Sequence, residues 1–193
     1  MKYNPRDRFF QKAKDEGFRA RSAYKLKEIQ QKFRLIKSGD LVVDLGAAPG
    51  AWSQVALQSS SPNGLVVGLD LKEIDWKAPN ARFYQMNVFE FDPGILENRK
   101  PDVLLSDMAP NTTGHRSVDQ ARSLELCSAV LDLAVEHLKP GGHCVMKVFE
   151  GPESKTLDKR MTGMFKEVKR YIPEAVRKGS IELYLVGLKK KDL

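Results

Sequence analysis

The sequence contains no long apolar run and few of the residues that bind metals. A membrane-spanning helix needs about 18–20 consecutive apolar residues, and no run in this chain of 193 residues approaches that length. There are only two cysteines, Cys127 and Cys144, and both lie in apolar segments where we expect small core residues. The three histidines, His115, His137 and His143, follow no metal-ligand spacing. These absences exclude an integral membrane protein and a disulfide framework, and we predict no metal site.

The amino-terminal region lacks the apolar segment of a secretory signal. It also carries Asp7, Asp15 and Glu16, and acids are scarce in mitochondrial presequences. We therefore expect a mature, cytoplasmic protein. With 41% hydrophobic and 30% charged residues, the composition is that of a soluble globular protein. The length suits a single domain over residues 1–193.

Acidic residues are in the minority, because 32 lysines and arginines face 25 aspartates and glutamates and give a net charge of +7. The imbalance is concentrated in about residues 1–37, which hold twelve basic and only four acidic side chains. This basic segment also contains Phe9, Phe10, Phe18 and Tyr24. A charged run is often only a solvated helix face, but cations interleaved with aromatic rings favour contact with an RNA backbone. We predict that the basic segment binds RNA.

Short apolar runs alternate with helical patterns between residues 22 and 149. The spacing of apolar residues predicts an amphipathic helix over Ser22–Ile36, ended by Gly39. Further helices are predicted over Ala51–Ser59 and Ser117–Leu138. Strands are predicted in five runs, at residues 41–46, 65–71, 81–88, 102–108 and 143–149. Strands that are apolar nearly throughout and alternate with helices are typical of a parallel sheet covered on both faces. The predicted fold class is therefore a doubly wound α/β domain.

The pattern changes after residue 150. A basic helix over about residues 155–165 precedes two strand-like runs, "KEVKRYI" at 166–172 and "IELYLVGLKK" at 181–190. The connection between these runs is too short for a parallel crossover. The sequence therefore predicts a hairpin, with an antiparallel strand at the end of the sheet.

The first predicted strand runs into "DLGAAPG", a turn of small residues at 44–50. This turn has neither the G-x-G-x-x-G pattern of a dinucleotide site nor the Gly-Lys-Ser/Thr ending of a phosphate loop. Pro49 also removes a backbone N–H that could bind phosphate. Gly46 and Gly50 admit a ligand close to the backbone, and Asp70, at the end of the second strand, can accept hydrogen bonds from two ribose hydroxyls. A phosphate-free adenosyl ligand fits both features and favours S-adenosylmethionine, while a tight turn without a ligand is the alternative.

Five motifs of the chain match a known family. "RSAYKLKEI", "DLGAAPGAWSQ", "LSDMAPN", "MKVFEG" and "IELYLV" occur in order between about Asp15 and Leu188. Together they resemble the FtsJ-like ribosomal RNA 2′-O-ribose methyltransferases over nearly the whole chain. The resemblance implies a Rossmann-like S-adenosylmethionine-dependent methyltransferase fold, with a seven-stranded, mostly parallel sheet, an antiparallel last strand and helices on both faces. It also implies S-adenosylmethionine as methyl donor and a uridine ribose of large-subunit ribosomal RNA as acceptor, in free RNA or in the large ribosomal subunit.

The same resemblance assigns the site residues. The family's Lys-Asp-Lys-Glu catalytic tetrad falls on Lys25, Asp107, Lys147 and Glu182. Together with the glycine turn, it predicts cofactor contacts from Gly46, Ala47, Pro49, Gly50, Trp52, Asp70, Asn87, Val88 and Asp107. Asn87 replaces the family's usual acid, but its side-chain oxygen can still accept a hydrogen bond from the adenine amino group. Trp52 either packs in the core or shapes the cofactor pocket, and we expect the second.

Methyl transfer from a sulfonium to a ribose hydroxyl requires a held trajectory and the removal of a proton from a weak acid. Lys147 is the candidate general base, because apolar neighbours and a second cation, Lys25, both favour its neutral amine. Asp107 would orient that amine, although its negative charge opposes the effect of burial. Lys25 and Glu182 would hold either the ribose or each other.

The resemblance leaves several alternatives open. Relatives with similar tetrads methylate transfer RNA or messenger RNA caps, so the RNA substrate is not fixed by these residues. A small-molecule methyltransferase would share the cofactor turn but would not need the basic segment. A non-catalytic RNA-binding or ribosome-assembly factor would not need an intact tetrad. Our prediction is a monomeric enzyme whose RNA-binding groove extends to Arg177 and Lys178, just before Glu182.

Overall fold

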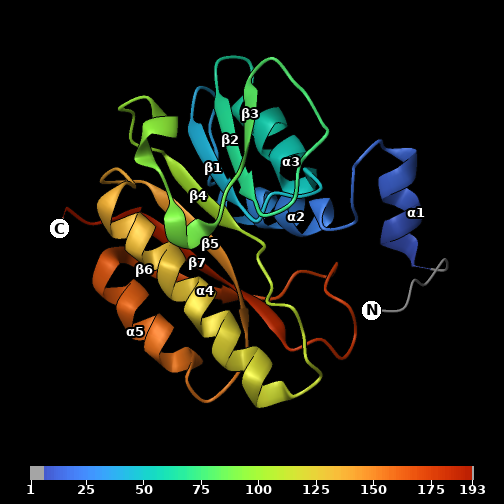
Figure 1. Ribbon diagram of the computed structural model, residues 1–193, viewed down its shortest axis with the longest axis vertical. Helices are drawn as coiled ribbons and strands as arrows, with labels where there is room; N and C mark the ends of the chain where they lie inside the picture. Colours follow the sequence, from blue (N-terminus) through green and yellow to red (C-terminus); the bar gives the residue numbers. More distant parts are fainter. Residues whose placement is uncertain (1–6, 193) are drawn as a thin grey trace.

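Seven strands form one sheet in the computed structural model, which describes residues 7–192. Their order is β3-β2-β1-β4-β5-β7-β6 (Figure 1). Five strands run parallel: β1 (Leu41–Leu45), β2 (Leu65–Asp70), β3 (Ala81–Gln85), β4 (Val103–Ser106) and β5 (His143–Phe149). Strand β7 (Glu182–Lys190) lies between β5 and β6 (Phe165–Tyr171) and is antiparallel to both. The mostly parallel sheet with an antiparallel last strand is thereby confirmed.

Helices cover both faces of this sheet (Figure 1). One face carries α2 (Ala23–Phe33) and α3 (Ala51–Ser60), and the other carries α4 (Arg116–Glu136) and α5 (Ser154–Met164). Successive residues of a strand point to opposite faces, and here both directions are apolar. Val42 joins the cluster beneath α2 and α3, whereas Val43 joins the cluster beneath α4 and α5. This double burial explains the continuous apolar runs that predicted a parallel sheet.

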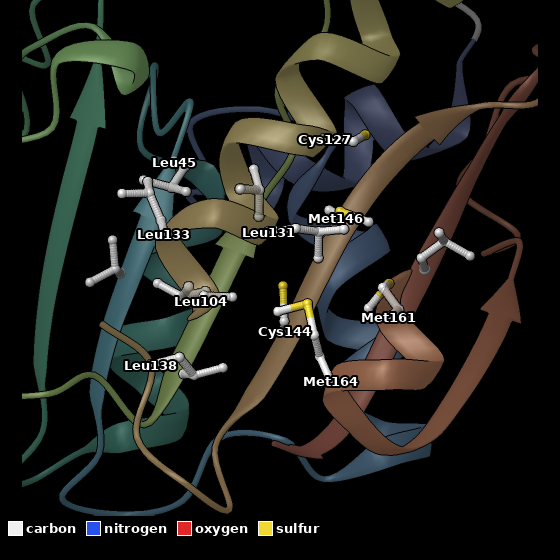
Figure 2. Close-up of a cluster of buried hydrophobic side chains, with 14 of the residues drawn as sticks. Leu45, Leu104, Cys127, Leu131, Leu133, Leu138, Cys144, Met146, Met161 and Met164 are labelled. Carbon is white, nitrogen blue, oxygen red and sulfur yellow. The ribbon is translucent and has the colours of Figure 1, made fainter. Parts of the chain in front are cut away.

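The larger core cluster lies between the sheet and the helices α4 and α5 (Figure 2). Both cysteines belong to it: Cys127 comes from α4 and Cys144 from β5, and each has a free, buried thiol. Burial raises the pKa of each thiol to about 12. The two cysteines are therefore core residues without a thiolate at neutral pH, as predicted.

The predicted helix over Ser22–Ile36 is too long at its carboxyl end. Helix α2 stops at Phe33, and Arg34 takes a left-handed conformation with φ of 51°. The side chain of Gln30 then turns back, accepting from the N–H of Ile36 at 2.9 Å and donating to its carbonyl oxygen at 2.7 Å. Ile36 is buried, as the periodicity required, but it reaches the core from extended chain rather than from the helix.

The basic segment contains a helix that apolar periodicity did not predict. Helix α1 (Arg8–Asp15) begins after Asp7, whose carboxylate accepts hydrogen bonds from the N–H groups of Phe9 and Phe10. Two short 3-10 helices, η1 (Val88–Glu90) and η2 (Pro93–Leu96), were also not predicted. Lys2 and Arg6, counted in the basic segment, lie outside the described residues. Within residues 7–192, no helix is long and apolar enough to cross a membrane.

Candidate active site

The carboxyl ends of β1, β2 and β4 surround a cavity of about 330 Å³. We call it the glycine-turn cavity, because Gly46 and Ala48 of the turn after β1 line it. Asp70 at the end of β2 and Asp107 just after β4 supply two carboxylates. Four predicted cofactor residues therefore lie together here: Gly46, Asp70, Val88 and Asp107.

The turn after β1 is fixed by the backbone of β2. The N–H groups of Gly46 and Ala47 both donate to the carbonyl oxygen of Leu69, at 2.8 and 2.9 Å. Gly46 has a φ of +77°, and a Cβ at this position would lie 2.4 Å from Cγ of Met108. A side chain there would meet both a disfavoured conformation and a steric clash. Only glycine keeps this wall of the cavity in place.

Asp70 holds the turn as well as lining the cavity. One carboxylate oxygen accepts from the N–H of Ala48 at 2.9 Å, and the other accepts from the N–H of Lys72 at 2.9 Å. Each carboxylate oxygen can accept a second hydrogen bond. Asp70 can therefore bind ligand hydroxyls while it fastens the turn to the end of β2.

Several predicted cofactor residues do not line this cavity. Trp52 is buried in the core, donates its indole N–H to the carbonyl oxygen of Ser22 at 2.9 Å and packs against the ring of Tyr184. The oxygen of Asn87 accepts from the N–H of Phe89 at 3.2 Å and caps η1. Ala47, Pro49 and Gly50 shape the turn from outside the cavity.

The cavity also has lining residues that were not predicted: Leu71, Lys72, Met86, Met108, Ala109 and Asn111. All six lie within five residues after the carboxyl end of β2, β3 or β4, whereas another unpredicted lining residue, Leu126, comes from α4. The sequence could have indicated the residues that follow strands, because the carboxyl ends of parallel strands meet at one edge of the sheet.

A second cavity, of about 410 Å³, opens beside the ends of β5 and β7. We call it the basic cavity, because its charged lining residues are Arg21, Lys25, Lys147, Arg177, Lys178 and the single acid Glu182. They come from α2 and the segment before it, from β5, from the connection between β6 and β7, and from the first residue of β7. This surplus of positive charge suits an anionic ligand.

Asp107 and Lys147 join the two cavities. The Nζ atom of Lys147 donates to the carboxylate of Asp107 at 3.0 Å and to its backbone oxygen at 2.6 Å. Only 8% of the Lys147 side chain is exposed. Since Asp107 lines the glycine-turn cavity and Lys147 lines the basic cavity, a ligand in one can meet a ligand in the other at this ion pair.

The other two residues of the predicted tetrad bind each other. Lys25 of α2 and Glu182 of β7 form an ion pair whose side chains are only 12% and 11% exposed. Lys25 also lies over the ring of Tyr184, with Nζ 5.7 Å from its centre. The pairing of Lys25 with Glu182 was one of the two arrangements expected, and the structure shows it.

Tyr184 belongs to this cluster but was not predicted. It is the register partner of Lys147 across β5 and β7, and its hydroxyl donates to the carboxylate of Asp107 at 2.6 Å. Burial raises the pKa of Tyr184 well above 10, and the negative charges of Asp107 and Glu182 raise it further. Its hydroxyl therefore stays protonated and acts as a donor. The sequence could have indicated Tyr184, because it follows Glu182 by two residues and so lies on the same face of the strand.

Beneath the glycine turn lies a fully buried acid, Asp44. One carboxylate oxygen accepts from the hydroxyl of Ser53 at 2.6 Å, and the other has no hydrogen-bond partner within residues 7–192. Burial raises the pKa of Asp44 to about 7; the Ser53 hydroxyl opposes this, while the charges of Asp107 and Asp70 add to it. Asp44 is thus partly protonated near neutral pH.

Hydrogen bonds tie the basic segment to the glycine turn and to α3. Gln54 of α3 accepts from the N–H of Arg19 at 2.8 Å and donates to the carbonyl oxygen of Gly17 at 3.1 Å. Arg19 in turn donates to the carbonyl oxygen of Pro49 and pairs with Asp75. The segment that carries Arg21 and Lys25 into the basic cavity is therefore positioned by the turn that forms the other cavity.

Residues 18–190 match the model of a family described as FtsJ-like methyltransferase. A Bdellovibrio bacteriovorus protein named ribosomal RNA large subunit methyltransferase E is 45% identical, over 99% of this chain and 100% of the relative. A protein of the same name from Acinetobacter baumannii is 46% identical, over 96% of this chain and 88% of the relative. The solved structure of a ribosomal RNA methyltransferase from Plasmodium falciparum superimposes with a TM-score of 0.82 at 28% identity, covering 91% of this chain and all of that one. The chain belongs to the FtsJ-like methyltransferase family.

Proposed function

We propose that this protein transfers a methyl group from S-adenosylmethionine to the 2′-hydroxyl of a ribose in large-subunit ribosomal RNA. The observation that carries the proposal is the meeting of two chemically distinct cavities at Asp107 and Lys147. One cavity suits a phosphate-free cationic ligand and the other suits a polyanion. The names of the similar proteins from Bdellovibrio bacteriovorus and Acinetobacter baumannii support large-subunit ribosomal RNA as the acceptor.

The glycine-turn cavity fits S-adenosylmethionine chemically. Asp70 and Asp107 present two carboxylates to it against one cation, Lys72. Such a balance favours a positively charged sulfonium and disfavours a nucleoside phosphate. Met86 and Val88 add apolar surface that suits a nucleobase, and Asp70 can accept from ribose hydroxyls. When bound there, S-adenosylmethionine supplies an electrophilic methyl group.

Lys147 is the residue we assign as general base. A neutral lysine amine has two N–H groups and one lone pair. The two hydrogen bonds to Asp107 use both N–H groups, so the lone pair is left to accept the proton of a hydroxyl in the basic cavity. The ribose O–H bond breaks as the new N–H bond forms on Lys147; with S-adenosylmethionine bound, the oxygen would gain the methyl group as the methyl–sulfur bond breaks, which would leave S-adenosylhomocysteine. The resulting ammonium is stabilised by Asp107.

Lys25 and Glu182 are assigned to holding the acceptor ribose. Each side chain already has one charged partner and lines the basic cavity. Because they are paired, the ammonium of Lys25 and the carboxylate of Glu182 are held in fixed orientations, from which Lys25 can donate to a ribose hydroxyl and Glu182 can accept from one. Arg21, Arg177 and Lys178 supply the cations for the flanking phosphates. We propose the basic segment as part of the same RNA-binding surface; a monomeric state and a cytoplasmic location stay predictions.

The test is transfer of a labelled methyl group from S-adenosylmethionine to large ribosomal subunits, protein-free ribosomal RNA and transfer RNA, with the labelled nucleotide mapped. We expect one labelled ribose in the large subunit or its RNA. Labelling of transfer RNA alone would contradict large-subunit ribosomal RNA as the acceptor and identify transfer RNA in its place. Absence of label in every RNA, despite cofactor binding, would favour a small-molecule acceptor or a binding role.

The role of Lys147 is tested in the same assay with Lys147→Ala. Transfer should fall by at least about a thousandfold, since a general base contributes roughly 10²–10⁴ in rate and the amine also orients the site. Affinity for S-adenosylhomocysteine should stay near that of the wild type, because Lys147 does not line the glycine-turn cavity. Lys159→Ala, which removes an exposed lysine of α5, is the matched control and should keep full activity. Near-normal turnover of Lys147→Ala would remove this residue from the mechanism.

A further inference from the structure

A third cavity, of about 220 Å³, lies beside the active site and takes no part in the chemistry proposed above. It opens between the first turns of α4 and α5, at the carboxyl end of β5. Its walls are mainly apolar and include Ala121, Leu124, Val148 and Phe149. We call it the apolar cavity.

The apolar cavity has polar groups at its edge. Gln120 donates from Nε2 to the carbonyl oxygen of Glu150 and lies flat against Gly151, where an added Cβ would come within 2.8 Å of its Cδ. Among the described residues, neither the oxygen of Gln120 nor the hydroxyl of Ser117 has a hydrogen-bond partner. An aromatic wall with one free acceptor and one free hydroxyl matches a flat heterocycle with polar edges.

Strand β5 links the apolar cavity to the catalytic centre, because Val148 and Phe149 line the apolar cavity and Lys147 lines the basic cavity. Phe149 follows Lys147 by two residues, which corresponds to about 7 Å along a strand. Phe149 is also the register partner of Glu182, which lines the basic cavity. A polynucleotide whose ribose lies at Lys147 therefore has a base within reach of the apolar cavity.

We propose that the apolar cavity binds an unstacked nucleobase of the RNA, at or next to the methylated nucleotide. The inference rests on the proposed function, since it assumes that RNA occupies the basic cavity. Proteins recognise single-stranded RNA by stacking splayed bases on aromatic side chains and by hydrogen bonding to the base edges. Enzymes that act on a nucleotide inside folded nucleic acid also draw it out of its stack into a pocket. Phe149, Gln120 and Ser117 supply these two kinds of contact.

The test combines a variant that fills the cavity with RNA that lacks the base. Ala121→Phe adds a ring inside the apolar cavity from an exposed helix position, so the core is not disturbed. Val135→Phe adds the same ring at an exposed position near the other end of α4 and is the matched control. The substrate is a short RNA containing the mapped acceptor nucleotide, made intact and in three versions without the acceptor base, the preceding base or the following base.

With wild-type protein and Val135→Phe, we expect one of the three abasic RNAs to lose about tenfold or more in kcat/KM, the scale of one lost base stack. With Ala121→Phe, the intact RNA should lose a similar factor and the same abasic RNA should lose no more than about twofold further. Affinity for S-adenosylhomocysteine should be equal in all three proteins. Independent, multiplying effects of the filled cavity and the missing base would overturn the proposal, as would full activity of Ala121→Phe. If the wild-type protein methylates no RNA, the proposed function itself fails, which is a different result.

Discussion

At the scale of single residues, one hydroxyl fixes the carboxylate that joins the two cavities. Tyr184 donates to Asp107 from a fully buried position and touches no cavity that we assign to a ligand. We expect Tyr184→Phe to lower the single-turnover rate by about tenfold to a hundredfold, because a buried hydrogen bond to a charged group is worth roughly 1.5–3 kcal/mol. Affinity for S-adenosylhomocysteine should change little. An unchanged rate would mean that Lys147 alone suffices to orient Asp107.

Asp44 predicts a dependence of stability on pH. Its pKa is about 7 in the folded protein and 3.8 in its ordinary state, so the unfolded chain loses this proton first as pH rises. The free energy of unfolding should therefore fall between about pH 4 and pH 7, by roughly 1.4 kcal/mol per pH unit at most, and level off above. Asp44→Asn should remove this contribution. Urea unfolding of both proteins at pH 5, 6, 7 and 8 measures it, and parallel profiles would contradict the prediction.

The limits of sequence reasoning are also clearest at single residues. The sequence indicated that Asp107, Lys147 and Asp70 would lie near one another, because each is close to the carboxyl end of a predicted strand and these ends share one edge of the sheet. Trp52 was misplaced because the sequence does not show in which direction a helical side chain points. It faces Ser22 and Tyr184 rather than the cavity, a contact that depends on how the basic segment crosses α3.

At the scale of elements, Gln54 links α3 to the chain that enters α2. It makes two hydrogen bonds, to Arg19 and to Gly17, and so sets the position from which Lys25 reaches the basic cavity. We expect Gln54→Ala to raise the KM for RNA about threefold to tenfold with a smaller effect on kcat, since two partly exposed hydrogen bonds are lost. Gln58→Ala, one turn further along α3 and exposed, is the matched control. Equal behaviour of the two variants would show that the contact does not position the RNA site.

Element boundaries show what periodicity can and cannot predict. Strand β5 was predicted with its observed bounds, because its apolar run is delimited by the turn before it and the loop after it. The end of α2 was missed because Ile36 keeps helical spacing although the chain has already left the helix at Arg34. Helix α1 was missed because Ala13 is its only buried residue, so its sequence shows no repeated apolar spacing. Side-chain hydrogen bonds, rather than apolar spacing, set the start of α1 at Asp7 and the course of the chain after α2 at Gln30.

At the scale of the whole molecule, the net charge of +7 should govern RNA binding more than cofactor binding. Binding of a single-stranded RNA releases counterions, and the logarithm of the association constant should fall with the logarithm of salt by about 0.7 for each phosphate neutralised. The cations of the basic cavity and the basic segment predict a slope steeper than about −2. Filter binding at KCl concentrations of about 50–400 mM, a range over which screening changes strongly, measures this slope. A flat profile would exclude a phosphate-binding surface.

The position of β7 has a consequence for how the enzyme comes into being. The last of the seven described strands along the chain is not an edge strand: it lies between β5 and β6 and carries Glu182 and Tyr184 into the candidate active site. Until it inserts, β6 has no neighbour in the sheet, Lys25 has no carboxylate to pair with, and Asp107 lacks one of its two side-chain donors. Such pairing between distant parts of a chain forms late in folding. A chain whose β7 has not yet paired therefore has an incomplete candidate active site, and we expect methyl transfer only after β7 has taken its place between β5 and β6.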